Sequence, residues 1–333
     1  MKIAVDVFGG DNAPLAVLEG CLLAQEQNAQ MELILVGEAS IIERYLLEHP
    51  HDAKRLCVLH APEIITANEQ PTAAIKHKRE SSLVKALLCV ADEEAGCMVS
   101  AGSTGALLAG ATLLVRRLKG VKRPALSPIL PSKGGCVALI DCGANVDSKP
   151  QYLQQFALMG SAYMQHIFGI AKPRVGLLNN GAEEEKGNEL TKAAFLLLKE
   201  QTPINFTGNC EGRDVLSGDF DVVVCDGFSG NIVLKNTEGV AGFMMDMLKE
   251  ELMADMRSKL GAMLAKPAFR RLKRKMDYTE YGGAPLLGIN GGIIKAHGSS
   301  NAKAFSAALR QAGAYIEGGV TNAIAQAIGA LQE

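Results

Sequence analysis

The feature that most constrains the fold is a repeated alternation of short apolar runs with longer segments whose apolar residues recur three and four positions apart. The short runs span residues 3–7, 33–36, 97–100, 137–140, 175–178, 222–225 and 293–296. The longer segments include residues 15–27, 73–91, 106–118, 152–167 and 190–200. Such runs are typical of buried parallel strands, and the longer spacing is typical of helices. The alternation therefore predicts a doubly wound α/β sandwich with a mostly parallel sheet.

Small and polar residues follow five of these runs, at the carboxyl ends of the predicted strands. They occupy residues 6–14, 100–105, 141–145, 179–181 and 226–231, and every segment contains glycine. Ligands of open α/β sheets bind beyond the carboxyl ends of the strands. The sequence therefore predicts that the five turns converge on one edge and form a ligand site.

Composition and charge indicate a globular protein that does not mainly bind nucleic acid. The 333 residues include 34 Lys and Arg against 36 Asp and Glu, and 48% of them are hydrophobic. A chain of this length and composition can bury a sizeable core. The near balance of charge argues against nucleic acid as the main partner, because binding to a phosphate backbone normally requires a basic excess.

The N-terminal segment and the apolar runs indicate a cytoplasmic protein. The first residues lack a basic segment followed by an apolar one, so no secretory signal is expected. No run approaches the roughly 18 apolar residues that a spanning helix needs.

The cysteines and histidines do not predict a disulfide framework or a metal site. The eight cysteines include no C-x-x-C pair, and several, such as Cys97, Cys136 and Cys225, lie in apolar runs. They are expected to be reduced core residues rather than nucleophiles. No H-x-x-x-H spacing occurs, so we expect no metal and no cofactor.

Glycine turns that open onto helices suggest an oxyanion ligand. Ser103, Thr104 and Gly105 form the best local candidate, because N–H groups at a helix N-terminus suit a phosphate. Taken alone, this turn is more often an ordinary N-cap, and only the several similar turns together favour the anion site. The dinucleotide fingerprint and the P-loop are both absent, and Asp11 follows Gly9-Gly10 where a pyrophosphate would lie. Nucleotide binding by either route is disfavoured.

Two further residues in such turns have functional and structural interpretations. Lys186 follows three consecutive acids. Such a run is usually the solvated start of a helix, where the dipole favours acids. A neighbouring carboxylate could instead hold the Lys186 ammonium in place as an anion ligand, but the residues alone favour the solvated start. His297 follows the run 293–296, at the carboxyl end of a predicted strand, where a lone histidine is more often structural than a group at the ligand site. Ser229 lacks the G-x-S-x-G spacing, so serine catalysis is not supported.

The segment 238–280 reads as a helical excursion from a single α/β domain that spans residues 1–333. Residues 238–265 fit one long amphipathic helix, and residues 268–276 fit a basic helix after Pro267. The stretch 252–276 suits a helix lying on an anionic bilayer. Its apolar residues suit contact with a second subunit equally well, and both contacts can coexist.

These turns, in this order, resemble the phosphate acyltransferase family known as PlsX, the acyl-ACP:phosphate transacylases of bacterial phospholipid synthesis. The similar blocks are residues 4–6 with 9–11, 100–106, 141–145, 176–187, 208–212, 226–235, 281–288 and 296–300. They cover nearly the whole chain. Four positions depart from the usual pattern, with Val7-Phe8 for Ala-Met, Ser103 for Asn, and Ala182 for the first of two glutamates.

The resemblance implies a three-layer α/β/α sandwich, similar to phosphotransacetylases and to the isocitrate and isopropylmalate dehydrogenases. It also implies a homodimer that transfers an acyl group from acyl carrier protein (ACP) to inorganic phosphate. A membrane glycerol-3-phosphate acyltransferase would then consume the acyl phosphate, so peripheral membrane contact would be useful. The competing function is that of a dehydrogenase, whose metal-binding carboxylates the sequence does not show.

Acyl transfer to phosphate needs a cation for the phosphate, a donor for the oxyanion and a proton for the departing thiolate. We expect Lys186 to position phosphate, with neutral donors from Ser103, Thr104 and Asn180. We expect Asn231, with the backbone around Gly230, to stabilise the oxyanion, and His297 to act as an acid, a base or an orienting group.

Other residues of the glycine turns are expected to shape the substrate site. The full expected set is Asp6, Gly9, Gly10, Asp11, Ser103, Thr104, Gly105, Asn145, Asn180, Asn209, Asp226 and Gly230. Among them Asp6, Asp11 and Asp226, together with Asp141, are expected to brace loops, because their charge opposes a dianionic phosphate.

Overall fold

The computed structural model describes residues 1–200, 203–276 and 282–331, and these form two sheets with helices on their faces. The first sheet has the order β3-β2-β1-β4-β12-β11-β5. Its strands are β1 (Lys2–Asp6), β2 (Glu32–Gly37), β3 (Leu56–His60), β4 (Cys97–Ser100), β5 (Ala125–Leu126), β11 (Ala284–Leu287) and β12 (Gly292–Lys295). All pairs are parallel except those of β11 with β12 and β5.

The second sheet has the order β6-β7-β10-β8-β9. Its strands are β6 (Ile129–Ser132), β7 (Gly135–Ile140), β8 (Arg174–Asn179), β9 (Asn205–Glu211) and β10 (Val222–Val224). Only β6 pairs antiparallel with its neighbour. All seven apolar runs are therefore strands, but they belong to two sheets. The prediction that five turns converge on one edge is wrong, because an apolar run does not encode which sheet its strand will join.

Alternating side chains of the first sheet face two separate cores. Ile3, Val5 and Val99 contribute to one cluster, whereas Ala4 and Met98 contribute to another. Helices α1 (Leu15–Gln27) and α10 (Ala302–Glu317) cover the first face and pack against each other, and α4 (Ser82–Ala91) covers the opposite face. This period of two is what a strand buried on both faces requires. It confirms the α/β sandwich expected from the runs.

The remaining helices complete the layers. They are α2 (Ala39–Glu48), α3 (Pro71–His77), α5 (Thr104–Gly110), α6 (Pro150–Phe168), α7 (Glu189–Glu200) and α11 (Val320–Gly329). The predicted helix 73–91 is divided between α3 and α4, because Ser81 caps a new helix by accepting the N–H of Val84. The predicted helix 106–118 continues from α5 as a π-helical turn (Ala111–Val115) and ends at Arg116, whose φ is 70°.

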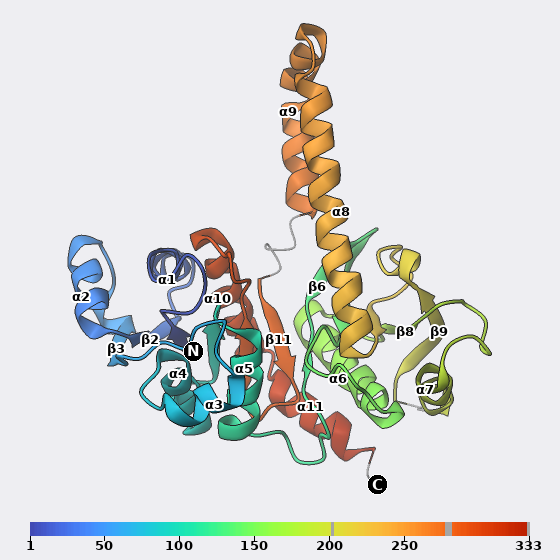
Figure 1. The fold of residues 1–333 in the computed structure, drawn as a ribbon, viewed down its shortest axis with the longest axis horizontal. Helices are drawn as coiled ribbons and strands as arrows, with labels where there is room; N and C mark the ends of the chain where they lie inside the picture. Colours follow the sequence, from blue (N-terminus) through green and yellow to red (C-terminus); the bar gives the residue numbers. More distant parts are fainter. Residues whose placement is uncertain (201–202, 277–281, 332–333) are drawn as a thin grey trace.

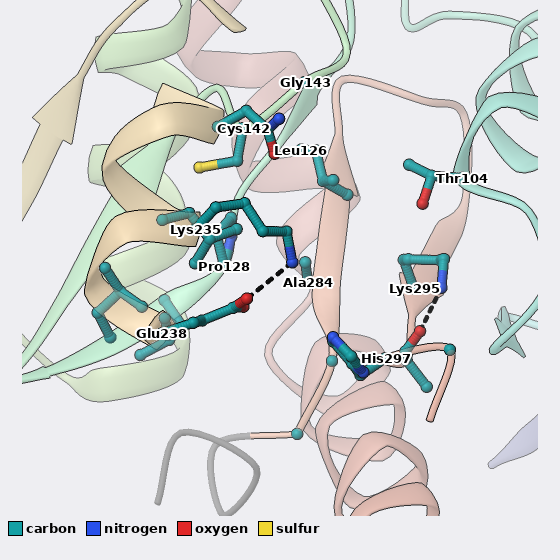
Figure 2. A pocket seen from close by; sticks show the side chains of 18 residues that line it. Thr104, Leu126, Pro128, Cys142, Gly143, Lys235, Glu238, Ala284, Lys295 and His297 are labelled. Carbon is teal, nitrogen blue, oxygen red and sulfur yellow. Dashed lines mark hydrogen bonds and ion pairs between the residues drawn. The ribbon is translucent and has the colours of Figure 1, made fainter. Parts of the chain in front are cut away.

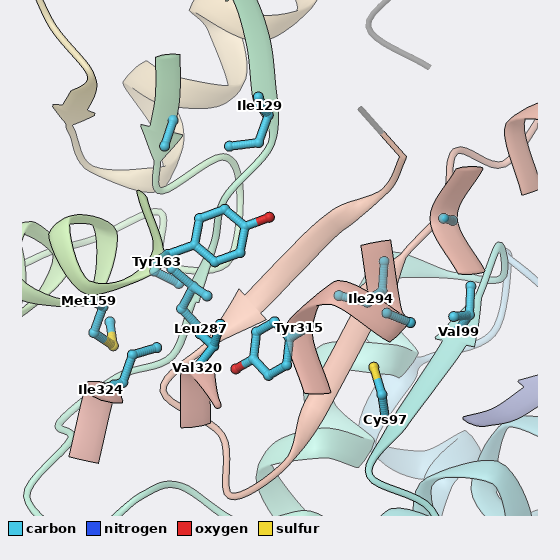
Figure 3. Packing of buried hydrophobic residues seen from close by; sticks show 14 of the residues in the cluster. Cys97, Val99, Ile129, Met159, Tyr163, Leu287, Ile294, Tyr315, Val320 and Ile324 are labelled. Atoms are coloured by element: carbon cyan, nitrogen blue, oxygen red, sulfur yellow. The ribbon is translucent and has the colours of Figure 1, made fainter. Parts of the chain in front are cut away.

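One hydrophobic cluster contains residues of both sheets. Val5 of the first sheet and Val222 of the second belong to it, together with Tyr163 of α6. Figure 3 shows Tyr163 close to Leu287 and Tyr315, between the elements of the two sheets. The Tyr163 hydroxyl also accepts a hydrogen bond from the Gln311 side chain at 2.9 Å. The two sheets thus share a core, which supports the proposal that residues 1–333 form a single domain.

A pair of helices, α8 (Gly227–Met253) and α9 (Met256–Met276), projects from this body (Figure 1). The sequence predicted a continuous helix over 238–265 and a break at Pro267, and both boundaries are wrong. The turn comes earlier because the Asp255 carboxylate accepts the N–H groups of Arg257 and Ser258, at 2.7 and 2.9 Å, and so begins a new helix. Pro267 lies inside α9. Residues 277–280 of the predicted excursion lie outside the described residues.

Most cysteines occupy the cores, as expected from their apolar surroundings. Cys21, Cys97, Cys210 and Cys225 are among those that are buried. Cys57 is exposed on the edge strand β3, and Cys136 is only partly buried. Among the described residues, no helix combines the length and apolarity that crossing a bilayer requires.

Candidate active site

A cavity of about 390 Å³ lies between the two sheets and is built from both. Thr104, Ala284 and Lys295 line it from elements of the first sheet, and Gly143 and Lys235 line it from the side of the second. Figure 2 shows Lys235 reaching from α8 toward the wall that carries Lys295 and His297. A concave site of this size at the carboxyl ends of strands is a common place for a small ligand.

Lys295, the last residue of β12, is a partly buried cation without an acidic partner. Its ammonium donates hydrogen bonds to the carbonyl of Ala101, at 3.2 Å, and to that of Ala296. Burial lowers the pKa of Lys295 to about 8, and Lys235 lowers it further, whereas Asp6 and Asp11 oppose the change. No carboxylate in the described part of the chain forms an ion pair with it. The cavity therefore contains an uncompensated positive charge.

Lys235 supplies a second cation on the opposite wall. Its ammonium pairs with Glu238 one turn later on α8, at 2.7 Å. Because the lysine side chain is half exposed while Glu238 is mostly covered, this surface pair is weak and leaves the ammonium accessible to an anion. Two ammonium groups facing one cavity favour a ligand with two negative charges.

Asp6 braces the turns that follow β1 and β4. Its buried carboxylate accepts the hydroxyls of Ser82 and Ser100, each at 2.6 Å. Burial raises the pKa of this carboxyl, and the two hydroxyls oppose that rise. A Cβ on Gly9 would lie 2.4 Å from the carboxylate, so only glycine fits there. This packing supports the expectation that Asp6 holds loops in place rather than binding phosphate.

The turn after β1 is tied to the turn that carries His297. The N–H of Asp11 donates to the carbonyl of Gly298 at 2.8 Å, and Gly10 adopts the φ of +106° that this approach needs. The N–H of Ser299 donates to Nδ1 of His297 at 3.3 Å. In the neutral ring the proton then resides on Nε2, so His297 offers an N–H donor at the cavity.

A second buried aspartate, Asp141, organises the turn after β7. Its carboxylate accepts the N–H groups of Leu126, Ala144 and Asn145, at distances from 2.7 to 3.1 Å, as well as the Asn145 side-chain amide. Burial raises its pKa, and these hydrogen bonds oppose the rise. Asn145 is consumed by this network, since its amide also donates to the carbonyl of Pro124 at 2.7 Å.

Helix α8 begins against this turn, and its first residues determine what enters the cavity. Asp226 caps the helix by accepting the N–H of Ser229 at 2.9 Å. A Cβ built on Gly230 would lie 1.9 Å from the carbonyl oxygen of Asp141. That close approach brings the next residue, Asn231, to the cavity wall beside Gly143.

The predicted site residues do not all meet in this cavity. Thr104, Asn231 and His297 line it together, but Asn180 and Asp226 line a second cavity of about 460 Å³, beside Ser229, which was not among the predicted residues. The first turns of α8 separate the two, because Asn231 and Ser229 face different sides.

Lys186 lies on the loop after β8 and lines neither cavity. A Cβ on Gly181 would lie 2.7 Å from the lysine side chain. The Asn209 amide holds the same loop by donating to the carbonyl of Glu183 at 2.7 Å. A role for Lys186 and Asn209 in substrate binding stays a prediction.

Two more predicted residues have local structural roles. Ser103 caps α5 by accepting the N–H of Ala106 at 3.4 Å, which is the N-cap alternative. A Cβ on Gly105 would lie 2.8 Å from Pro71, so this glycine permits close packing of α5 on α3.

Sequence reasoning missed Lys235, Glu238 and Lys295. One signal was present, because Lys295 is the single cation in the apolar run 293–296 and stands near the carboxyl end of the predicted strand. The positions of Lys235 and Glu238 depend on the direction of α8, which no local pattern reveals.

Cys142 is the cysteine at the cavity wall. Burial raises its pKa well above that of an ordinary thiol, and the charge of Asp141 adds to the effect. A thiolate nucleophile is therefore not available there. Among the described residues, no group of three or more His, Cys, Asp or Glu side chains is arranged to hold a metal ion.

The comparisons with known proteins decide the family. The family model described as "Fatty acid synthesis protein" matches residues 1–323. A phosphate acyltransferase of Clostridium perfringens is 50% identical over 98% of this chain and 97% of its own length. One of Clostridium acetobutylicum is 51% identical over 94% of each chain. The chain belongs to the phosphate acyltransferase (PlsX) family. It is therefore an acyltransferase, as the resemblance of its glycine turns to that family implied.

The solved structures that resemble the chain support the fold. A phosphotransacetylase from Streptococcus pyogenes has a TM-score of 0.64 at 17% identity and covers 95% of this chain and 94% of its own. A 4-hydroxythreonine-4-phosphate dehydrogenase from Klebsiella pneumoniae has a TM-score of 0.53 at 13% identity, with 94% and 96% covered. The expected α/β/α architecture is thus confirmed, and at these identities nothing is implied about substrate.

The contact between α8 and the turn after β7 leads to a prediction. Gly230→Ala should destabilise the protein by about 1–3 kcal/mol, because the added methyl overlaps the Asp141 carbonyl. Urea denaturation followed by circular dichroism measures the change. Gly239→Ala on the same helix is the matched control, since a Cβ there meets nothing within 4 Å. Equal stability of the two variants would contradict the close contact.

Proposed function

We propose that the protein transfers a fatty acyl group from acyl-ACP to inorganic phosphate and releases acyl phosphate and ACP, an early step of phospholipid synthesis. The observation that carries the proposal is the pair of ammonium groups, Lys235 and Lys295, facing one cavity at the end of β12. A dianion such as hydrogen phosphate is the ligand that this charge favours. Family membership supplies the acyl transfer.

The two walls of the cavity suit the two substrates. Thr104, Lys295 and His297 provide polar groups on one wall. Leu126, Ile129 and Leu234 belong to an apolar portion of the lining that suits an acyl chain near its thioester. A phosphate held at the polar wall can attack a carbonyl carbon placed against the apolar one, and no covalent enzyme intermediate is required.

In the transition state a negative charge develops on the thioester oxygen. The Asn231 amide at the start of α8 can donate to this oxygen, as can Nε2–H of His297. Donors that are fixed before the reaction stabilise such a charge without reorganisation, and one of them contributes about 10²–10³-fold to kcat. The anchoring of α8 on Asp141 keeps Asn231 fixed in this sense.

The assay of the proposed function uses the purified protein with long-chain acyl-ACP and phosphate, without added metal. Acyl phosphate should form. Asn231→Ala should lower kcat about 10²–10³-fold, and His297→Ala should lower it about 10²-fold. Lys235→Met should raise the KM for phosphate, because half of the cationic charge that holds it is lost. Lys54→Met, on an exposed turn far from the cavity, is the control.

The same assay tests the prediction for Lys186. If Lys186 positions phosphate, Lys186→Ala will lower turnover as strongly as the cavity variants. If Asn231, His297 and Lys186 variants all keep wild-type kinetics, the site is elsewhere. No acyl phosphate, together with turnover of a hydroxy acid and a nicotinamide cofactor, would favour the dehydrogenase alternative.

We further propose that the helix pair α8–α9 forms a dimer nearer the body and contacts anionic lipid at its tip. Phe243 and Met244 of α8 are exposed apolar residues between the body and the tip. Leu260 and Leu264 are exposed within the first turns of α9. Arg270 lies about 21 Å along α9 from its first residue at 1.5 Å per residue. The basic residues near the tip are therefore Arg257 and Lys259.

Paired variants separate the two contacts. Replacing Leu260, Met263 and Leu264 by Asp should abolish sedimentation with phosphatidylglycerol vesicles and preserve the dimer and soluble turnover. Replacing Phe243 and Met244 by Ser should give monomers by analytical ultracentrifugation. A tip variant that dissociates into monomers would show that Leu260, Met263 and Leu264 form the subunit interface. A tip variant that still binds vesicles would show that the lipid contact lies elsewhere.

A further inference from the structure

The departing thiolate needs a proton, and the geometry of Lys295 makes it a candidate donor. An ammonium has three N–H groups. Two of them are directed to the carbonyls of Ala101 and Ala296, which fix the position of the nitrogen. In the described part of the chain no third acceptor is found for it, and the side chain lines the cavity. The remaining N–H is therefore available to a substrate.

The surroundings of Lys295 also make its ammonium acidic. Asp6 is occupied by two serine hydroxyls, and Asp11 acts only at a distance. On the facing helix, Lys235 repels the charge, while Glu238 is paired with Lys235 rather than with Lys295. His297, the other titratable group at this wall, offers its Nε2–H to the same space. Lys295 thus lacks the acidic partner that Lys235 has.

We propose that Lys295 is a catalytic residue that donates its proton to the leaving sulfur, an inference that rests on the proposed acyl transfer to phosphate. An oxygen of hydrogen phosphate forms a bond to the thioester carbonyl carbon. The carbon–sulfur bond then breaks, and the sulfur leaves with the electron pair and takes a proton from the Lys295 ammonium. Acylation makes the remaining P–OH group more acidic, so the phosphate proton returns to the lysine amine. No proton is consumed overall.

The geometry of Lys295 is the basis of this role, and its acidity relative to the leaving thiol is consistent with it. The cysteine thiol has a pKa near 8.5, an alkyl thiol without adjacent peptide groups is more basic, and burial lowers the pKa of Lys295 to about 8. A donor of this acidity protonates the sulfur readily and is still protonated near neutral pH. The ammonium form is present below the folded-state pKa and is lost as pH rises through it. Donation should therefore fail above about pH 8.

The experiment compares two acyl donors whose leaving groups differ in basicity. Acyl-ACP releases a basic alkyl thiolate, whereas an acyl nitrothiophenyl ester releases a weakly basic thiolate that needs no proton. Lys295→Arg retains the positive charge but cannot donate its proton near neutral pH. We expect kcat with acyl-ACP to fall about 10²–10³-fold, kcat with the aryl ester to stay within about fivefold, and the fall in kcat above about pH 8 to disappear.

Several results would overturn the proposal. Equal losses with both donors, or a raised KM for phosphate with unchanged kcat, would make Lys295 a phosphate ligand only. A wild-type kcat that is constant between pH 7 and 10 would exclude it as the proton donor without any variant, so misfolding of Lys295→Arg does not obscure the answer. Lys54→Arg is the matched control. If wild-type protein forms no acyl phosphate at all, the proposed function fails instead.

Discussion

The close packing of α8 against the turn after β7 is the constraint on which both the site and the projecting helices depend. Gly230 lies so near the Asp141 carbonyl oxygen that a residue with a Cβ does not fit there without a shift of the backbone. The N–H of Gly227 also donates to the carbonyl of Asn145 at 2.8 Å, and Asp226 caps the helix. Together these contacts set the direction of a 27-residue helix from its first turn.

That direction has consequences at both ends of α8. Near its start, Asn231 and Lys235 face the cavity, where Lys295 and His297 approach from the other sheet. Its far end carries exposed apolar residues away from the body. The buried carboxylates of Asp6 and Asp141 hold the turns on the two sides. They accept hydrogen bonds instead of contacting ligand, so they position the site without opposing an anion.

Much of the fold could be predicted from local pattern, because a buried parallel strand is a continuous apolar run wherever it occurs. The run 97–100 coincides with β4, and the run 222–225 differs from β10 by one residue. The assignment of these strands to two sheets could not be predicted, since pairing depends on contacts between distant segments. The end of α8 was missed because the apolar spacing is helical both before and after Asp255. Only the cap formed by the Asp255 carboxylate separates the two helices.

A residue could be assigned to the site from the sequence where it lies just beyond the carboxyl end of its own strand. His297 and Thr104 meet at the cavity because each lies shortly after a strand of the same sheet, and these two strands are neighbours. Lys295 is the last residue of β12, whereas Lys186 lies in the loop after β8, and only the three-dimensional arrangement shows that Lys295 lines the cavity and Lys186 does not. The resemblance to the family gave Lys186 preference, whereas its acidic neighbours alone favoured a solvated segment, and the structure places those acids on an exposed loop.

The most direct test of this account is a crystal structure of the protein with phosphate and an acyl-pantetheine thioether that cannot be cleaved. The account places the phosphate between the Lys235 and Lys295 ammonium groups, with the carbon that replaces the carbonyl near Asn231. Phosphate bound instead in the second cavity, against Asn180 and Asp226, would contradict it.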